Sequence, residues 1–188
     1  MDKIEKLLVL HKNVFTTQDL SVVWGISEKT KLWEVIKYYL RKNKLHRIYR
    51  GIYSLDKKYL ELELAQKIQP ISYISLHTAL SIHGINFQYY SSIYSMSVIS
   101  KKYIVAGIEY SYHQVKDFIF YNKLGLIDKK SYILASKERA ICDALYIWPS
   151  MNMDHVEVVD EDILYQIALI YKNKRLVADI QRLIQKFH

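Results

Sequence analysis

The sequence predicts an α+β protein of two domains, and three observations carry this prediction. Helical periods, a glycine turn and a strand-like hairpin follow one another within residues 1–56. Basic residues concentrate in the same segment. Residues 93–121 are instead rich in Tyr, Ile, Val, Ser and Phe with period-two alternation, which is typical of β-strands. We therefore predict a winged helix-turn-helix in residues 1–56, followed in residues 57–188 by an α+β domain with an antiparallel sheet and C-terminal helices.

The composition is compatible with two cores and with a reducing compartment. The 188 residues are 51% hydrophobic, which is enough for one large or two small domains. Cys142 is the single cysteine, so an intrachain disulfide is impossible. The N-terminal segment contains charges that do not fit a signal peptide, and no apolar run reaches the length of a membrane span. We expect a cytoplasmic protein without a membrane partner.

Positive charge is distributed unevenly along the chain. The net charge is +8, of which +5 falls in residues 1–56 and +3 in residues 57–188. Residues 29–50 hold eight Lys and Arg residues against one acid, Glu34. Such a concentrated patch attracts the phosphate backbone of nucleic acids. The composition is basic in general, so the clustering is the informative part.

The first domain begins with two predicted helices. Residues 2–11 place apolar side chains at a helical period. Thr16 or Thr17 provides an N-cap for the second helix, and Asp19 follows Thr16 by three residues, which is close to a capping box. Gly25 ends this helix, because glycine adopts the left-handed conformation that a tight turn needs.

A third and very basic helix follows the turn. Ile26 is expected to be buried in the turn, and Ser27 is expected to cap the helix. Apolar residues recur every three or four positions and define the inward face: Leu32, Val35, Ile36, Tyr39 and Leu40. The opposite face carries Lys29, Thr30, Lys31, Trp33, Lys37 and Arg41.

The outward face of this helix suits a DNA groove. In a helix-turn-helix, the N-terminal residues of the second helix meet base edges and the flanking cations meet phosphates. On this basis Lys29, Thr30, Lys31 and Trp33 are assigned to the groove. Lys37 and Arg41 are assigned to the backbone or the groove edge. For Trp33 the alternative interpretation is core packing.

Residues 45–55 predict a β-hairpin, because side chains alternate on both sides of Gly51. Arg47, Tyr49 and Arg50 are placed to reach an adjacent groove or phosphate. The alternative interpretation is a charged hairpin that contacts only solvent.

The second domain is predicted to start at Lys57-Lys58. Its expected elements are helices at residues 59–68 and 76–83, three or four strands within 93–121, a strand at 131–134, and helices at 137–147, 160–171 and 174–187. Ser75 and Ser136 are the expected caps of the second and third of these helices.

The second domain offers weak signals for chemistry. His77 and His83 are six residues apart and Cys142 has no neighbouring ligand, so no metal or other cofactor is expected. Asp117, Asp128 and Lys130 loosely imitate a metal-dependent nuclease, in which two carboxylates hold a metal and a lysine orients water. The alternative interpretation of residues 126–131 is a solvated turn.

A more pointed motif lies in residues 136–143. Arg139 and Asp143 are four residues apart, so they share one helical face and can pair. Glu138 lies near the helix N-terminus, where its charge is favoured. These residues form either a partner-binding or catalytic site, or an ion pair that locks the helix onto the sheet. The structural interpretation is preferred.

With these residues identified, the chain resembles the AbiEi-type antitoxins of abortive-infection, type IV toxin–antitoxin systems. Three pieces carry the resemblance: residues 50–55 (RGIYSL), residues 73–85 (YISLHTALSIHGI) and residues 135–143 (ASKERAICD). They occur in the expected order over most of the chain.

The resemblance implies a non-enzymatic bacterial repressor that binds double-stranded DNA at inverted repeats upstream of its own operon. It also implies that the second domain opposes a nucleotidyltransferase toxin, without requiring a stable complex. Two alternatives remain open: a winged-helix-targeted nuclease or other DNA-processing enzyme, and a protein-interaction module that has lost DNA binding.

Overall fold

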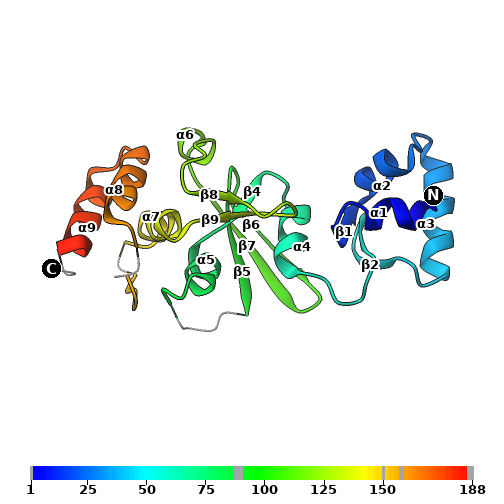
Figure 1. Cartoon of the computed structure of the whole chain (residues 1–188), viewed down its shortest axis with the longest axis horizontal. Coiled ribbons are helices and arrows are strands. Elements are labelled where there is room, and N and C mark those ends of the chain that lie inside the picture. Colours follow the sequence, from blue (N-terminus) through cyan, green and yellow to red (C-terminus); the bar gives the residue numbers. More distant parts are fainter. Residues whose placement is uncertain (1, 87–90, 150, 157–158, 186–188) are drawn as a thin grey trace. The chain divides into compact units, whose positions relative to one another are not determined.

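A computed structural model describes residues 2–86, 91–149, 151–156 and 159–185 (Figure 1). The chain divides into two compact units, Met1–Pro70 and Ile71–His188. Each unit combines helices with a β-sheet, so the α+β class is confirmed. The sequence placed the boundary after Asp56, whereas the structure includes helix α4 (Glu61–Ile68) in the first unit, where it contacts strand β1 (Val14–Thr16).

The first unit is built from short helices and a three-stranded sheet. The strands are antiparallel in the order β1-β3-β2, and Val14 of β1 lies opposite Ser54 of β3. The element order is α1 (Lys3–Leu8), β1 (Val14–Thr16), α2 (Thr17–Trp24), α3 (Lys29–Arg41), β2 (His46–Tyr49), β3 (Ile52–Ser54) and α4 (Glu61–Ile68).

The predicted caps of α2 are confirmed, and the predicted cap of α3 is wrong. The hydroxyl of Thr16 accepts from the amide of Asp19 at 3.0 Å, and the Asp19 carboxylate accepts from the amide of Thr16 at 2.8 Å. Gly25 has φ 66° and ends α2 in the left-handed conformation. The residue that precedes α3 is Glu28 rather than Ser27, and its side chain makes no capping hydrogen bond.

The core of the first unit lies between the three N-terminal helices and the sheet. The helical periods placed the core of α3 correctly, because Leu32, Ile36 and Tyr39 are buried and Val35 and Leu40 are half-buried. The ring of Tyr39 packs 5.6 Å from that of Trp24, centroid to centroid. The buried set is Leu7, Phe15, Leu20, Trp24, Ile26, Leu32, Ile36, Tyr39, Leu45 and Tyr53.

The second unit contains a six-stranded sheet in the order β6-β7-β5-β4-β9-β8. Its described elements are β4 (Ser72–Ile74), α5 (Leu76–Ile82), β5 (Ser92–Ser97), β6 (Lys101–Val105), β7 (Ile108–Gln114), α6 (Asp117–Phe120), β8 (Leu126–Asp128), β9 (Ile133–Ala135), α7 (Lys137–Ile147), α8 (Glu161–Ile170) and α9 (Lys174–Gln185). The last two residues of the predicted helix 174–187 lie outside the described residues.

The sheet is mixed and not antiparallel as predicted. β5 pairs with β7 in parallel, and so does β4 with β9. The pairs β4–β5, β6–β7 and β8–β9 are antiparallel. The pattern of residues 93–121 correctly predicted strands as far as Gln114, but Asp117–Phe120 form helix α6. Alternation is the same for either direction of pairing, so it did not indicate the parallel pairs.

Two local predictions in the second unit are also wrong. Residues 126–128 form strand β8, where a turn was expected, because a strand of three residues is too short to display a period. Ser75 precedes α5 but makes no capping hydrogen bond, since its hydroxyl donates to Asp143 instead.

Helices cover the sheet of the second unit in two layers. α5 contacts β5 and α7, and α7 contacts β9. α8 and α9 pack on α7, on the side away from the sheet (Figure 1). α7 therefore lies between the sheet and the C-terminal helices, which explains why all of residues 138–145 are buried.

Candidate nucleic-acid interface

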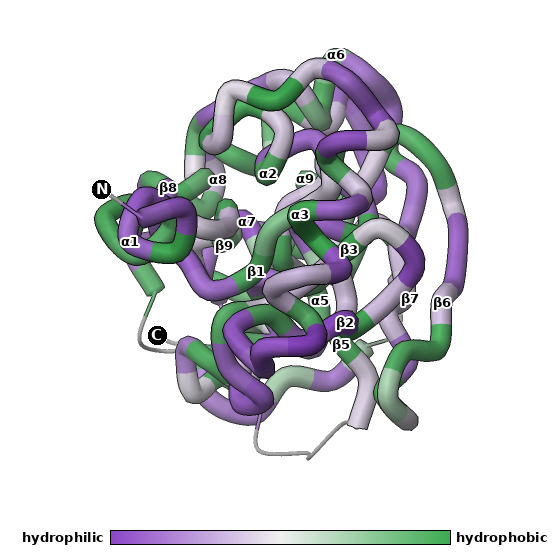
Figure 2. Tube along the Cα trace, turned by 90° about the vertical axis from the view of Figure 1, so that its right-hand side faces the viewer, coloured by the Kyte–Doolittle hydropathy of each residue, from purple (hydrophilic) through white to green (hydrophobic). Residues whose placement is uncertain are grey.

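α3 separates an apolar face from a basic one. The six residues assigned to its outward face are all exposed: Lys29, Thr30, Lys31, Trp33, Lys37 and Arg41. Trp33 is 41% exposed, so it is not a core residue. Hydrophilic and hydrophobic segments alternate along α3 in Figure 2. The helix therefore presents four cations, a hydroxyl and an indole ring to solvent from one element.

The β2–β3 hairpin adds further exposed cations. Arg47, Tyr49 and Arg50 are exposed, whereas Ile48 between them is half-buried. The register shifts between Arg47 and Tyr49, and a β-bulge of this kind changes the direction of side chains at a sheet edge. Gly51 has φ 73°, and its carbonyl accepts hydrogen bonds from the amide and hydroxyl of Thr17 at 2.8 and 3.2 Å. The hairpin turn is thus tied to the start of α2.

Side-chain hydrogen bonds join the three N-terminal helices of the first unit. The hydroxyl of Tyr39 donates to Asp2 at 2.8 Å, and the indole nitrogen of Trp24 donates to the carbonyl of Lys3 at 2.9 Å. Burial and the Asp2 carboxylate raise the pKa of Tyr39 to about 12. In the turn, the hydroxyl of Ser21 donates to the carbonyl of Ile26 at 2.7 Å. These bonds tie α3 to the N-cap of α1, α2 to α1, and the turn to the end of α2.

α4 is fastened to the same unit by two charged residues that the sequence analysis missed. Glu63 is 3% exposed, and its carboxylate accepts from the amides of Asn13 and Val14 at 3.1 and 3.0 Å. Burial raises the pKa of Glu63. Lys67 donates to Asp19 at 2.7 Å, so α4 is also paired with the first turn of α2. Periodicity indicated the helix but gave no signal for these partners.

Replacing Lys67 with methionine is expected to make the free energy of unfolding of the first unit depend less steeply on pH in the acidic range. Burial acts to raise the pKa of Asp19, but hydrogen bonds from Lys67 and Thr16 outweigh it and lower the pKa below its ordinary value. A lowered pKa in the folded state contributes stability above the ordinary value near 4, and this contribution is lost as pH falls through the folded value. Urea titrations of the first-unit signal between pH 6 and about 2 measure the slope. An unchanged slope in Lys67→Met would contradict the expectation.

The Arg139–Asp143 pair is fully buried in the second unit. Nε of Arg139 lies 3.7 Å from Oδ1 of Asp143, and neither side chain is exposed. Arg139 donates to the carbonyls of Ile119 at 2.7 Å and Leu124 at 3.1 Å. The guanidinium therefore joins α7 to the segment that contains α6.

Three hydroxyl groups complete the surroundings of Asp143. Its carboxylate accepts from Tyr171 at 2.6 Å, Ser75 at 2.7 Å and Tyr73 at 3.1 Å. Burial raises the pKa of Asp143, while Arg139 and the hydroxyl donors act in the opposite direction. Tyr73, Ser75 and Tyr171 were missed from the sequence, because nothing local relates them to residue 143. The pair and its three hydroxyl partners are thus joined in one buried hydrogen-bond network.

Glu138 is also a buried, bonded residue. It is 5% exposed, and Oε2 accepts from the hydroxyl of Ser136 at 2.9 Å. Oε1 accepts from the amide of Asp160, the residue that caps α8, at 3.4 Å. Ser136 caps α7 as predicted, by accepting from the amide of Arg139 at 3.2 Å. Glu138 thus links the N-termini of two helices.

The nuclease-like residues belong to three different elements: the end of strand β8, the turn that follows it, and the short helix α6. Asp128 accepts from the amide of Lys130 at 2.7 Å, which is the hydrogen bond of an Asx turn, and Lys130 has φ 68°. Asp117 lies in the first turn of α6. Among the described residues, no group of three or more His, Cys, Asp or Glu could hold a metal ion.

The first unit matches a known family. Residues 2–55 match the family model described as transcriptional regulator, AbiEi antitoxin. The resemblance is confirmed over these residues, which include α3 and the β2–β3 hairpin. No curated protein matches the chain. Within the described residues, no helix has both the length and the apolar character needed to cross a membrane.

Proposed function

From the match of residues 2–55 to the AbiEi antitoxin regulators, we propose that the first unit is a winged helix-turn-helix that binds operator DNA, and that the protein represses its own operon. One observation carries the proposal. The apolar positions of α3 belong to the core, while the nine residues expected to contact DNA are all exposed. These nine are Lys29, Thr30, Lys31, Trp33, Lys37, Arg41, Arg47, Tyr49 and Arg50.

The element order supports this architecture. α2, a tight turn at Gly25, and α3 follow one another in the order expected of a helix-turn-helix, in which the second helix enters the major groove. The β2–β3 hairpin follows directly and supplies the wing. β1 completes its sheet and connects the hairpin to the start of α2.

The chemistry of the exposed residues suggests their roles. Lys29, Thr30 and Lys31 lie in the first turn of α3, where a helix meets base edges and where backbone amides favour phosphate. Lys37 on α3 and Arg50 in the hairpin turn extend as cations suited to phosphates on either side. This division assigns base preference to the start of α3 and general affinity to the other cations.

We further propose that the protein acts in the cytoplasm as the antitoxin of a type IV system, without catalysis of its own. The second unit would oppose a nucleotidyltransferase toxin encoded nearby, without a stable complex. The buried bonding of Glu138, Arg139 and Asp143 supports a scaffold role for these residues rather than contact with a toxin. Co-expression with the neighbouring nucleotidyltransferase tests this role. The full chain is expected to restore growth. A failure to restore growth would contradict the antitoxin role.

Replacing Lys37 or Arg50 with alanine is expected to weaken DNA binding equally for operator and unrelated duplexes. Each lost phosphate contact should reduce the slope of log K against log salt by about 1. Fluorescence anisotropy at several salt concentrations measures both quantities. Both side chains are exposed, so stability should change by less than about 0.5 kcal/mol.

Lys6→Ala provides the matched control, because Lys6 is an exposed lysine of the same unit outside the assigned residues. Its affinity and salt slope should equal those of the unmodified chain. Equal slopes for Lys37→Ala, Arg50→Ala and Lys6→Ala would remove Lys37 and Arg50 from the interface.

A further inference from the structure

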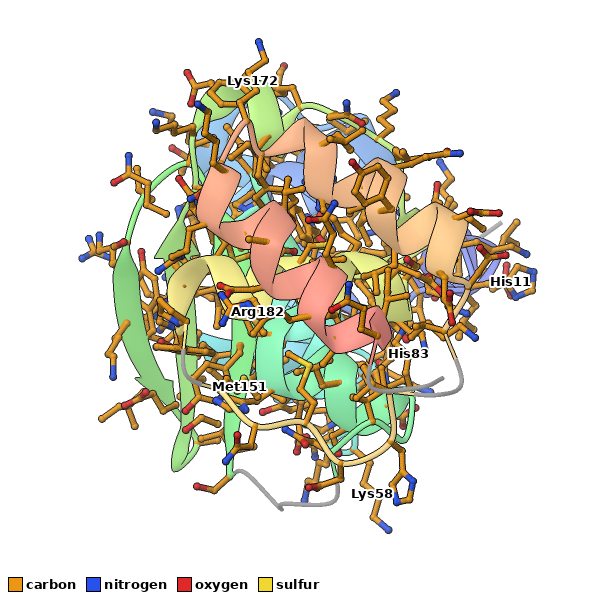
Figure 3. All side chains as sticks on the ribbon, turned by 90° about the vertical axis from the view of Figure 1, so that its left-hand side faces the viewer. His11, Lys58, His83, Met151, Lys172 and Arg182 are labelled. Carbon is orange, nitrogen blue, oxygen red and sulfur yellow. The ribbon has the colours of Figure 1, made fainter. Side chains whose placement is uncertain are left out.

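A row of exposed aromatic and basic side chains crosses α6 in the second unit. Phe118 is 45% exposed and Tyr121 is 64% exposed. They are three residues apart on one helical turn, so they face the same side. The ammonium group of Lys172 lies 5.2 Å from the centroid of the Phe118 ring. Lys172 lies in the turn between α8 and α9, and Figure 3 shows its side chain pointing away from the ribbon.

A cavity continues this row beyond Tyr121. Its volume is about 300 Å³, and it lies between α6, β4, β8 and β9. Tyr73, Phe120 and Tyr121 supply aromatic walls; the rings of Tyr73 and Phe120 are stacked at 5.6 Å. Lys123 and Asp128 are exposed residues that line the same cavity. Its lining therefore combines aromatic rings with a lysine and a carboxylate.

Charge around the row is predominantly positive. Residues 116–130 carry four lysines and two aspartates, all of them exposed, and Lys172 adds a fifth cation. Lysine is depleted at protein–protein interfaces. Aromatic platforms interleaved with cations are instead how proteins bind single-stranded nucleic acid, because bases stack on the rings and phosphates meet the cations.

We propose that this surface binds single-stranded nucleic acid. Bases stack on Phe118 and Tyr121, one base enters the cavity beside Lys123 and Asp128, and Lys172 contacts a phosphate. A base paired within a duplex has both faces covered by its neighbours, so it cannot enter an aromatic cavity without leaving the stack. The inference concerns the second unit and does not depend on operator binding by the first.

The test uses the full chain and fluorescent single strands of about 12 nucleotides, a length within the usual site sizes. Oligouridine and oligodeoxyuridine are the two probes. The tighter-binding probe shows whether the surface prefers RNA or DNA. Tyr121→Ala is expected to weaken binding about tenfold through the loss of stacking, and Tyr121→Phe is expected to retain it. Lys172→Ala should lower the salt slope by about 0.7.

Two controls locate the effect. Tyr165→Ala removes a 37% exposed tyrosine from α8 and should leave affinity unchanged. Lys37→Ala reduces any contribution of the first unit, and the tenfold effect of Tyr121→Ala should persist in that background. Photocrosslinking with 5-iodouracil should attach the probe to the peptide that contains Phe118 and Tyr121.

Unmodified affinity in Tyr121→Ala, or crosslinks confined to residues 29–50, would overturn the proposal. Capture of an acidic protein through Tyr121, with no binding of either oligonucleotide, would overturn it as well. Tyr121 is largely exposed, so an unchanged melting temperature is expected to accompany each result.

Discussion

Asp143→Ala is expected to destabilise the second unit by about 3–5 kcal/mol, the range found when one partner of a buried ion pair is removed. The change leaves the fully buried guanidinium of Arg139 without its carboxylate. It also removes the acceptor of the Tyr73, Ser75 and Tyr171 hydroxyls. Domains are stable by only about 5–15 kcal/mol, so a large share of the unit's stability is lost.

Hydrogen exchange of the α7 amides in the full chain measures this loss, because α7 carries both residues of the pair. Asp162→Ala, an exposed acid in the first turn of α8, is the matched control and should cost less than about 1 kcal/mol. Replacing both residues, as in Arg139→Met with Asp143→Leu, should cost less than Asp143→Ala alone. Equal protection in Asp143→Ala and Asp162→Ala would contradict the structural role of the pair.

Gly125→Ala is expected to cost about 2–4 kcal/mol, from strain and overpacking together. Gly125 has φ 75°, a region that side chains with a Cβ rarely adopt. An added Cβ would lie 2.8 Å from both Cβ of Arg139 and Cδ1 of Ile167. The carbonyl of Gly125 accepts from the amide of Ser136 at 2.7 Å, so a shift of this loop would disturb the cap of α7.

Gly107→Ala separates the two contributions. Gly107 has φ 83°, but an added Cβ would have no neighbour within 4 Å. It should therefore cost only the conformational part, about 1–2 kcal/mol. Thermal and urea unfolding of the two variants give the difference. Equal losses in Gly125→Ala and Gly107→Ala would mean that the loop accommodates a methyl group beside Arg139.

Local sequence signals located most helices and their ends. Thr16, Gly25 and Ser136 marked helix boundaries because a cap requires particular side chains or a particular φ within a few residues. The face of α3 followed from the helical period alone. The exposure of the six outward-facing residues of α3 could be predicted for the same reason, whereas their contact with DNA stays a prediction.

Features that depend on distant residues could not be predicted. β1, β4 and β8 have three residues each, which is too few for a period to appear. β5 pairs in parallel with β7, and the alternation of side chains along a strand does not indicate which strand lies beside it. Ser75 looked like a helix cap but donates to Asp143, 68 residues away in the sequence. The motif of residues 136–143 was visible in the sequence. Its hydrogen-bond partners, however, come from β4, from α6 and from Tyr171 at the C-terminal end of α8.

The most direct test of the central proposal is an anisotropy titration of the full chain with duplex DNA from upstream of its own gene. A shuffled duplex of equal composition is the reference. At about 0.15 M salt the upstream duplex should bind at least about 1,000-fold more tightly, as specific sites do. Thr30→Ala should reduce this ratio, since Thr30 is assigned to the bases. Equal affinity for the two duplexes would contradict sequence-specific binding by the first unit.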